Sequence, residues 1–343
     1  MMNFRRLLFP FSWLYILVTD IRNVLYDKRI FKSASFDIPL IAVGNLRVGG
    51  EGKTPHIEYL VQLLQPAKKV AILSRGYQRK TRGYAEVKIN STPEQCGDEP
   101  VQFKNKFPEA FVAVDEQRAL GIAHILMDAE DMEVILLDDA FQHRSVKAGL
   151  YILLTSYGRL YTRDAVLPAG NLRERKKGAE RAQVIIVSKC PHKLSETEQQ
   201  EIIRELNPLP HQQVFFTSIG YDRMRPLFAS SHDTNAENIL LVTGIANPQP
   251  LLEYCKTRFT AVKHMRFADH HAFTDNDITR IVTEMNTLPQ GSILLTTEKD
   301  AMRLKEKTAL QNLPVYFLPI KTEFLAQEDT FRKTILNYVN TNT

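Results

Sequence analysis

The chain has 343 residues, of which 44% are hydrophobic and 24% are charged, and its formal net charge is +5. A chain of this size and composition buries a sizeable core, which excludes a disordered or fibrous protein and favours about two domains. Its three cysteines, Cys96, Cys190 and Cys255, are widely spaced, which argues against a disulfide framework or a zinc site and fits a reducing compartment.

The N-terminal segment, residues 1–35, carries an apolar run from Leu7 to Val18 between basic residues. The run is shorter than the roughly 20 residues that cross a bilayer, and no small-residue cleavage site of a secretory signal follows it. We predict an amphipathic helix on a membrane surface; a terminal helix packed on the core is the alternative. The interfacial aromatic residues would be Phe9, Phe11, Trp13 and Tyr15, and the basic ones Arg5, Arg6, Arg22, Lys28 and Arg29.

A glycine-rich turn ending in Gly-Lys-Thr follows the apolar run Ile38 to Val43, which reads as a buried strand. Such a turn wraps backbone N–H groups around nucleotide phosphates, its lysine neutralises phosphate charge and its threonine ligates Mg²⁺. A helix from Pro55 to about Leu64 would point its positive end at the same phosphates. In the pattern G-x-x-x-x-G-K-[ST], Arg47 takes the place of the first glycine, and a plain glycine turn before a helix is the alternative. The predicted nucleotide-binding residues are Arg47, Val48, Gly49, Gly50, Glu51, Gly52, Lys53 and Thr54.

Apolar strands alternate with helices along the rest of the chain. Strands are predicted at 69–74, 111–114, 133–137, 150–154 and 183–187, with a helix over 118–127, and a second α/β pattern has strands at 239–242, 261–267, 292–296 and 315–318. Continuous apolar strands of this kind form a mostly parallel sheet covered by helices, with ligands at the carboxyl ends of the strands. We therefore predict an α/β core over 36–220, a linker over 221–238 and a smaller α/β domain over 239–343.

Carboxylates stand at three places in the predicted pattern. Asp138 and Asp139 end a buried strand, where a carboxylate can hold Mg²⁺ directly or through water. The acidic turn Gly97 to Pro100 offers two neighbouring carboxylates, of which one can bind metal and the other accept a proton. A histidine beside an aspartate, at Asp269-His270, can serve as a base or orient one. Each group taken alone also fits a solvated turn or strand end.

Other nucleotide-binding classes fit the chain less well. Pro191 stands where GTPases carry the aspartate that reads guanine, and Val48 stands where partitioning ATPases carry a lysine. The remaining alternatives are a GTPase or metallochaperone-like NTPase and a membrane-associated scaffold with a vestigial nucleotide loop. The basic loop Arg75 to Arg82 is short and no base-reading motif is present, so nucleic-acid binding is not expected.

Eight motifs together resemble the tetraacyldisaccharide 4′-kinase family, the lipid A 4′-kinases, in the order that the family has them. They are Val43-Gly44-Asn45 with Gly49 to Pro55; Ser74 to Tyr77; Gly97 to Pro100; Asp138-Asp139 with Phe141 to Arg144; Leu167 to Glu174; Thr243 to Pro248; Asp269-His270-His271; and Thr297 to Ala301.

The resemblance implies a P-loop kinase domain, a smaller α/β domain and an active site in the cleft between them. The enzyme would move the γ-phosphate of ATP to the 4′-hydroxyl of a lipid A disaccharide 1-phosphate, with Mg²⁺. It would be peripheral to the cytoplasmic face of the inner membrane of a Gram-negative bacterium, with no protein partner evident.

The same resemblance implies roles for individual residues. Asp98 would be the catalytic base, paired with His270, and Lys53 would bind phosphate. The metal side would be formed by Thr54, Glu99, Asp138 and Asp139. Further nucleotide contacts would come from Arg118, Arg173 and Glu174, and lipid contacts from Arg75, Tyr77 and Gln142. The sequence departs from the family pattern at Gln78, Ala140 and Arg175, which puts loop conformation in doubt rather than chemistry.

Overall fold

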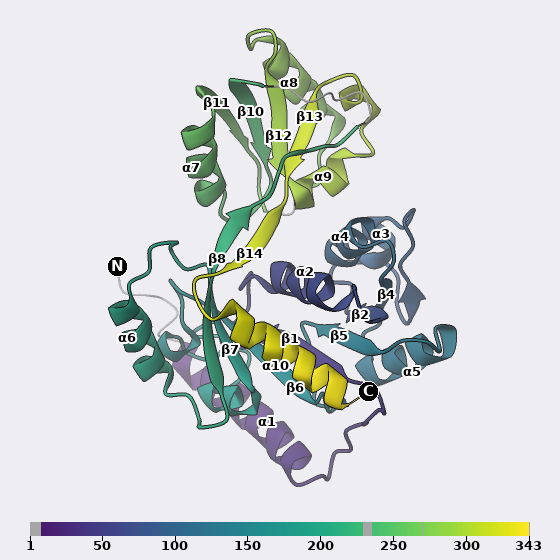
Figure 1. The fold of residues 1–343 in the computed structure, drawn as a ribbon, viewed down its shortest axis with the longest axis vertical. Helices are drawn as coiled ribbons and strands as arrows, with labels where there is room; N and C mark the ends of the chain where they lie inside the picture. The colour runs from purple at the N-terminus through teal and green to yellow at the C-terminus, as the bar shows by residue number, and fades with distance from the viewer. Residues whose placement is uncertain (1–7, 229–234, 270, 343) are drawn as a thin grey trace. The chain divides into compact units, whose positions relative to one another are not determined.

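The computed structural model describes residues 8–228, 235–269 and 271–342, and the chain divides into two compact units (Figure 1). The first unit comprises the described parts of residues 1–220 and 321–343, and the second comprises those of residues 221–320. Each unit is an α/β structure built on a sheet of its own.

The first unit contains a nine-stranded sheet with the order β14-β8-β7-β6-β1-β5-β2-β4-β3. Pairing is parallel from β8 through β4, and β3 is antiparallel to β4. The strands are β1 (Leu40–Asn45), β2 (Val70–Ser74), β3 (Ala85–Glu86), β4 (Phe111–Val114), β5 (Val134–Asp138), β6 (Leu150–Ser156), β7 (Val184–Ser188), β8 (Gln213–Tyr221) and β14 (Ile320–Phe324). All residues of β1, β2, β5 and β7 are buried, so the prediction of a parallel sheet covered on both faces is confirmed.

Alternate residues of β1 point into different cores. Ile41 and Val43 pack in the cluster that contains buried residues of α2, α4 and α10, whereas Leu40 and Ala42 pack in the cluster with α5. The helices of this unit are α1 (Phe9–Asp27), α2 (Lys53–Leu64), α3 (Pro93–Cys96), α4 (Asp98–Lys106), α5 (Arg118–Asp128), α6 (Glu196–Leu206) and α10 (Glu328–Thr341). Because Val43 pairs with Asp138, the loop after β1 and the acidic end of β5 emerge side by side.

The second unit contains a five-stranded sheet with the order β11-β10-β12-β13-β9, in which only β9 is antiparallel to its neighbour among the described pairs. Its strands are β9 (Arg225–Pro226), β10 (Asn238–Thr243), β11 (Ala261–Arg266), β12 (Ile293–Thr297) and β13 (Val315–Leu318), and its helices are α7 (Gln249–Arg258), α8 (Asp275–Asn286) and α9 (Glu298–Leu304). The four strands that the sequence predicts here are confirmed.

The boundaries of the second unit differ from those we predicted. The segment after residue 320 returns to the first unit, because β14 joins its sheet and α10 buries Phe331, Ile335 and Val339 in its core. Residues 221–238 are not a plain linker, since β9 within them pairs with β13 of the second unit. Periodicity along the chain reports an apolar helix face but not which of two cores that face joins.

Helix α1 docks on the first unit through polar groups. The buried Ser12 hydroxyl donates to the Val166 carbonyl over 3.1 Å, and the Tyr15 hydroxyl donates to the Arg173 carbonyl over 3.1 Å. Tyr15 therefore faces the protein, contrary to our expectation, and Arg22 donates to the Gln142 carbonyl. The outer face is apolar and exposed, and it consists of Phe9, Phe11, Trp13, Leu14, Leu17, Val18, Ile21 and Val24.

None of the described helices combines the length and the apolar character needed to cross a lipid bilayer. Arg5 and Arg6, which we expected beside lipid head groups, lie outside the described residues.

Candidate functional site

The turn after β1 is held from within by Asn45. Its side-chain amide donates to the Arg47 carbonyl over 2.6 Å, and its Oδ1 accepts from Lys53 Nζ over 3.2 Å. The preceding Gly44 has no room for a side chain, because a Cβ there would lie 2.6 Å from Cβ of Phe141. The Val-Gly-Asn motif thus fixes the start of the loop against the segment that follows β5.

Helix α2 begins directly after the loop, with Gly52 in a left-handed conformation at its N-cap. Gly52 lacks a side chain that could cap the helix, and the first N–H groups of a helix have no partner within it. Together with the helix dipole, this end favours an anion such as a phosphate. Lys53, the first residue of α2, also lies 3.4 Å from Oδ1 of Asp139.

The neighbouring acids Asp138 and Asp139 have opposite electrostatic environments. Burial raises the pKa of Asp138 to about 7, and the nearby Glu99 carboxylate adds to that shift against the opposing effect of Lys53. Burial also works against ionisation of Asp139, but Lys53 and Arg173 outweigh it and hold the pKa of Asp139 below its usual value. Asp139 is therefore a paired anion, whereas Asp138 forms no ion pair among the described residues.

Two oxygen groups fit a magnesium ion at this position. Asp138 is buried and accepts from Ser74 on one oxygen, while its Oδ1 has no hydrogen-bond partner among the described residues. The Thr54 hydroxyl donates to the Glu99 carboxylate over 2.9 Å. Carboxylate and hydroxyl oxygens are ligands that Mg²⁺ prefers. Within the described ranges, no cluster of three His, Cys, Asp or Glu side chains could hold a metal ion, so phosphate and water oxygens would complete its shell.

The acidic turn is shaped by close backbone contact. Gly97 has a φ of +91°, and a Cβ on it would lie 3.0 Å from the Tyr77 carbonyl oxygen. This contact brings the loop after β2 against the start of α4, where Asp98 and Glu99 form the first turn. Tyr77 is 67% exposed, so its ring is accessible beside the acidic turn.

Arg118, which we predicted as a nucleotide contact, turns its side chain into the protein. It is fully buried at the start of α5, and its guanidinium donates to the main-chain carbonyls of Asp115 and Asp138. Burial lowers the pKa of Arg118 to about 10, against the attraction of the neighbouring acids. The side chain therefore supports the end of β5 from beneath.

Arg173 and Glu174 also make contacts that the sequence did not reveal. Arg173 Nη1 donates to both oxygens of Asp139, over 3.0 and 3.1 Å. The buried Glu174 accepts from Arg181, Asn23 and Gln142. Gln142 donates further to the Asn45 carbonyl. The side chains of Glu174 and Gln142 thus bridge α1, the strand ends and the loop before β7.

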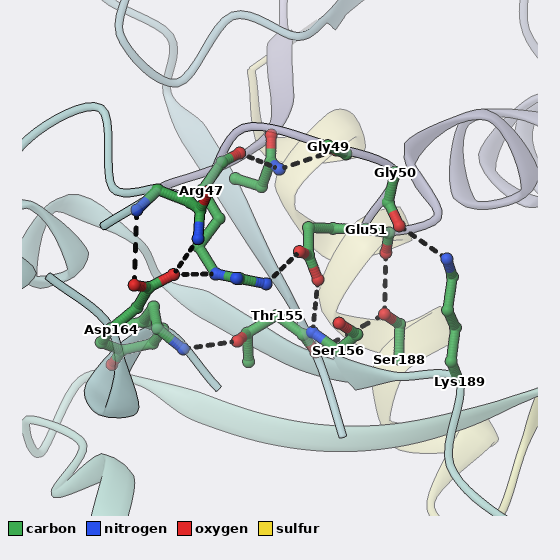
Figure 2. Close-up of polar contacts among 12 residues, drawn as sticks. Arg47, Gly49, Gly50, Glu51, Thr155, Ser156, Asp164, Ser188 and Lys189 are labelled. Carbon is green, nitrogen blue, oxygen red and sulfur yellow. Dashed lines mark hydrogen bonds and ion pairs between the residues drawn. The ribbon is translucent and has the colours of Figure 1, made fainter. Parts of the chain in front are cut away.

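Arg47 and Glu51, which we predicted to bind the nucleotide, direct their side chains into the protein. Figure 2 shows Arg47 between Glu51 and Asp164 beneath the turn. Arg47 donates to Asp164 over 2.6 Å and to Glu51 over 3.3 Å, and Glu51 is fully buried. Burial works against ionisation of Asp164, but Arg47 and its other donors hold the pKa of that carboxyl below its usual value. At this loop position Arg47 and Glu51 can offer a phosphate only their backbone.

Ser188 and Lys189, at the end of β7, brace the same loop, and the sequence did not lead us to them. The Ser188 hydroxyl donates to the Glu51 carbonyl over 2.7 Å, and Lys189 Nζ donates to the Gly50 carbonyl over 2.6 Å (Figure 2). The sequence shows a serine and a lysine at the end of a buried strand, which could have indicated contacts with the loop. We considered that stretch only as a possible guanine-recognition motif.

The histidine that we paired with Asp98, His270, lies outside the described residues. Its neighbour His271 contacts Asp277 over 2.9 Å and stacks on Phe267. In the same unit Asp300 accepts from the Gly244 amide and the Thr297 hydroxyl. The motif that contains His271 and the motif that contains Asp300 are thus held by side-chain contacts within the second unit.

Comparisons with known proteins agree on one family. The family described as tetraacyldisaccharide-1-P 4′-kinase matches residues 4–340. A tetraacyldisaccharide 4′-kinase of Flavobacterium johnsoniae is 49% identical over 341 residues, covering 98% of each chain, and one of Bacteroides thetaiotaomicron is 45% identical, covering 98% of this chain and 93% of that one. The crystal structure of LpxK from Aquifex aeolicus in complex with ATP is similar with a TM-score of 0.77 and 29% identity, covering 98% of this chain and 99% of that chain.

Proposed function

The chain belongs to the tetraacyldisaccharide-1-phosphate 4′-kinase family, and from that premise we propose how its residues transfer phosphate from ATP to the 4′-hydroxyl of a lipid A precursor. Phosphoryl transfer needs positioning and charge stabilisation more than covalent chemistry from the protein. The residues therefore divide into those that hold ATP and those that present the acceptor hydroxyl.

ATP is held by the loop from Arg47 to Thr54. The backbone N–H groups of Gly49 to Gly52 and of the first turn of α2 face the β- and γ-phosphates, and Lys53 neutralises their charge. The contacts of Lys53 with Asn45 and Asp139 support this role, because they keep its ammonium at the mouth of the loop. Arg173 steadies Asp139 and thereby the orientation of Lys53.

Magnesium supplies electrostatic stabilisation of the phosphate charge when it is bound. Thr54, Asp138 and Glu99 are the residues that would hold it, with Asp139 near them. The unpartnered Oδ1 of Asp138 supports this assignment, because a buried carboxylate oxygen without a donor is costly unless a cation joins it.

One observation carries the assignment of the base: the 2.9 Å hydrogen bond from Thr54 to Glu99. It ties the phosphate loop to the acidic turn, which supports a position of the adjacent, partly exposed Asp98 near the phosphates. Asp98 accepts the proton of the 4′-hydroxyl while that oxygen bonds to the γ-phosphorus and the bond from this phosphorus to the departing ADP breaks. Tyr77, whose carbonyl borders the acidic turn, and Arg75, two residues before it, contact the disaccharide head group.

The substrate carries acyl chains, and the exposed apolar face of α1 offers a surface for the membrane that holds them. Because α1 docks by its polar face, its outer aromatic and aliphatic side chains are available to the lipid interface. We place the enzyme at the cytoplasmic face of the inner membrane. Trp13→Glu with Leu17→Glu is expected to abolish sedimentation with phosphatidylglycerol-containing vesicles; retained sedimentation would refute this surface, and Ile89→Glu, on a different exposed segment, is the control.

The function is tested with γ-labelled ATP and a tetraacyl disaccharide 1-phosphate in detergent micelles. We expect label in the lipid with the wild type and not with Lys53→Ala. Hydrolysis of ATP or GTP without labelled lipid would instead favour an NTPase, and a Lys53→Ala variant with full transfer would refute the phosphate loop assignment.

A further inference from the structure

The phosphate loop of this chain contains an acidic residue. Glu51 lies between Gly50 and Gly52, directly before the lysine that binds phosphate in the proposed function. A carboxylate turned toward a triphosphate at this position would repel it, and the repulsion would be strong away from bulk water. The Glu51 side chain instead lies entirely beneath the loop, with no solvent exposure (Figure 2).

Two donors hold the buried carboxylate of Glu51. Its Oε1 accepts from Arg47 Nη1 over 3.3 Å, and its Oε2 accepts from the backbone N–H of Ser156 over 2.7 Å. The Ser156 amide is part of β6 and cannot move without the sheet. Arg47, by contrast, is the only charged side chain among the described contacts of Glu51, so it provides the compensating positive charge.

Arg47 is itself fixed on its other side. Its Nε donates to Asp164 Oδ2 over 2.6 Å, and the same oxygen accepts from Asn171 over 3.1 Å. The Asn171 carbonyl in turn accepts from the Val48 amide over 2.8 Å, so the segment that carries Asp164 runs along the loop. One guanidinium thus lies between two carboxylates, the buried Glu51 and the partly exposed Asp164. We name Glu51, Arg47 and Asp164 the Arg47 clamp.

Removing different charges of the Arg47 clamp is expected to have different effects. Loss of Glu51 leaves Arg47 paired with Asp164. Loss of Arg47 removes the one ion pair that the described residues give the fully buried Glu51. A buried charge whose partner is removed is strongly unfavourable, and its easiest escape is to turn toward solvent. Glu51 is part of the loop, so one route to solvent for its carboxylate is the side of the loop where phosphates would sit.

We propose that Arg47 is a positioning residue for ATP, which keeps the Glu51 carboxylate beneath the phosphate loop and out of the triphosphate site. Arg47 occupies the position where the nucleotide-loop pattern has its first glycine, and the Arg47 clamp gives a reason for an arginine there together with an acid four residues later. The inference rests on the proposed function, because it requires this loop to bind ATP.

The test is a double-mutant cycle on the full-length protein with the substitutions Arg47→Ser and Glu51→Thr. Arg47→Ser is expected to raise the KM for ATP about tenfold or more, with the KM for the lipid unchanged. Glu51→Thr alone is expected to change the KM for ATP less than about threefold. Adding Glu51→Thr to Arg47→Ser is expected to bring the KM for ATP most of the way back to the wild-type value. A pocket of about 220 Å³ is lined by Arg47 and Asp164 but not by Glu51. It gives water access to Asp164 when the guanidinium is removed, so the variants should fold.

A matched control is the exposed pair of Arg163 and Glu205, which also joins the segment after β6 to the protein. Arg163→Ala is expected to leave the KM for ATP unchanged. If the double variant is as impaired as Arg47→Ser, or if Glu51→Thr is the worse single change, the inference is overturned. If the wild type neither binds ATP nor labels the lipid, the proposed function itself fails, which is a separate outcome.

Discussion

Two buried aspartates lie at corresponding ends of the two sheets, Asp138 at the end of β5 and Asp300 just after β12. Burial raises the pKa of both, yet their surroundings differ. Asp300 accepts from the Gly244 amide, the Thr297 hydroxyl and Arg303, so both of its oxygens are used. Asp138 accepts from Ser74 alone, and its Oδ1 has no partner within the described part of the chain.

The difference shows that a buried acid at the end of a strand can have either of two roles, binding a ligand or stabilising the fold. A carboxylate with all its hydrogen bonds made stabilises the fold around it, whereas one left short of donors costs stability and is ready for a cation. The first unit therefore carries its unsatisfied acid where ATP and magnesium are proposed to bind, and the second unit uses its acid to tie two loops together. Substitution of each acid should separate activity from stability.

The largest expected effect is that of Asp138→Asn on activity. The neutral amide keeps the size of the side chain and its contact with Ser74 but removes the charge that magnesium requires. We expect turnover to fall about a thousandfold, with a melting temperature equal to or above that of the wild type because a buried, under-partnered charge is gone. Asp139→Asn is the control, and its melting temperature should fall, since Lys53 and Arg173 lose their partner.

A smaller effect, on stability, is expected from Asp300→Ala. The change leaves the Gly244 amide without its acceptor and removes a partner of Thr297, so the second unit should lose about 2–4 kcal/mol of unfolding free energy. The loss of stability is measured by hydrogen exchange of peptides from β10 to α9. Exchange in those peptides that matches the wild type would show that Asp300 is not the anchor we describe.

The smallest effect concerns pH. Because burial raises the pKa of Asp300 above its ordinary 3.8, against the opposing hydrogen bonds, the folded state keeps this proton to a higher pH than the unfolded state. Stability from this group is therefore present below that ordinary value and lost as pH rises through the raised one. Asp300→Asn should flatten this decline in urea unfolding measured at successive pH values, and an identical slope in wild type and variant would contradict it.

Much of the fold was predictable because the strands are continuous apolar runs. The strands at 111–114 and 315–318 match β4 and β13 residue for residue, and the helix over 118–127 differs from α5 by one residue. The return of α10 to the first core was not predictable, because its amphipathic pattern fits either unit. The inward face of α1 was missed for a related reason: Ser12 and Tyr15 sit in an apolar run, and only tertiary contacts reveal that they bond to the protein.

The site was predictable to the extent that it depends on motifs. The glycine-rich turn and the acidic strand end identified Lys53, Thr54 and Asp138, which the structure brings together with Glu99 around one loop. The orientation of side chains was not predictable, as Arg118 and Glu51 illustrate: both are charged, and both are fully buried on partners distant in sequence. Residue type and spacing do not specify which side of a loop a charge takes.

The most direct test of the account compares ATP binding and phosphoryl transfer in Asp98→Asn. Because Asp98 is proposed to accept the acceptor's proton and not to hold ATP, the variant should bind Mg-ATP within about twofold of the wild type in calorimetry while single-turnover labelling of the lipid falls by about 10²–10⁴-fold. Undiminished labelling, or a loss that follows entirely from weaker ATP binding, would contradict the role of Asp98 as the base.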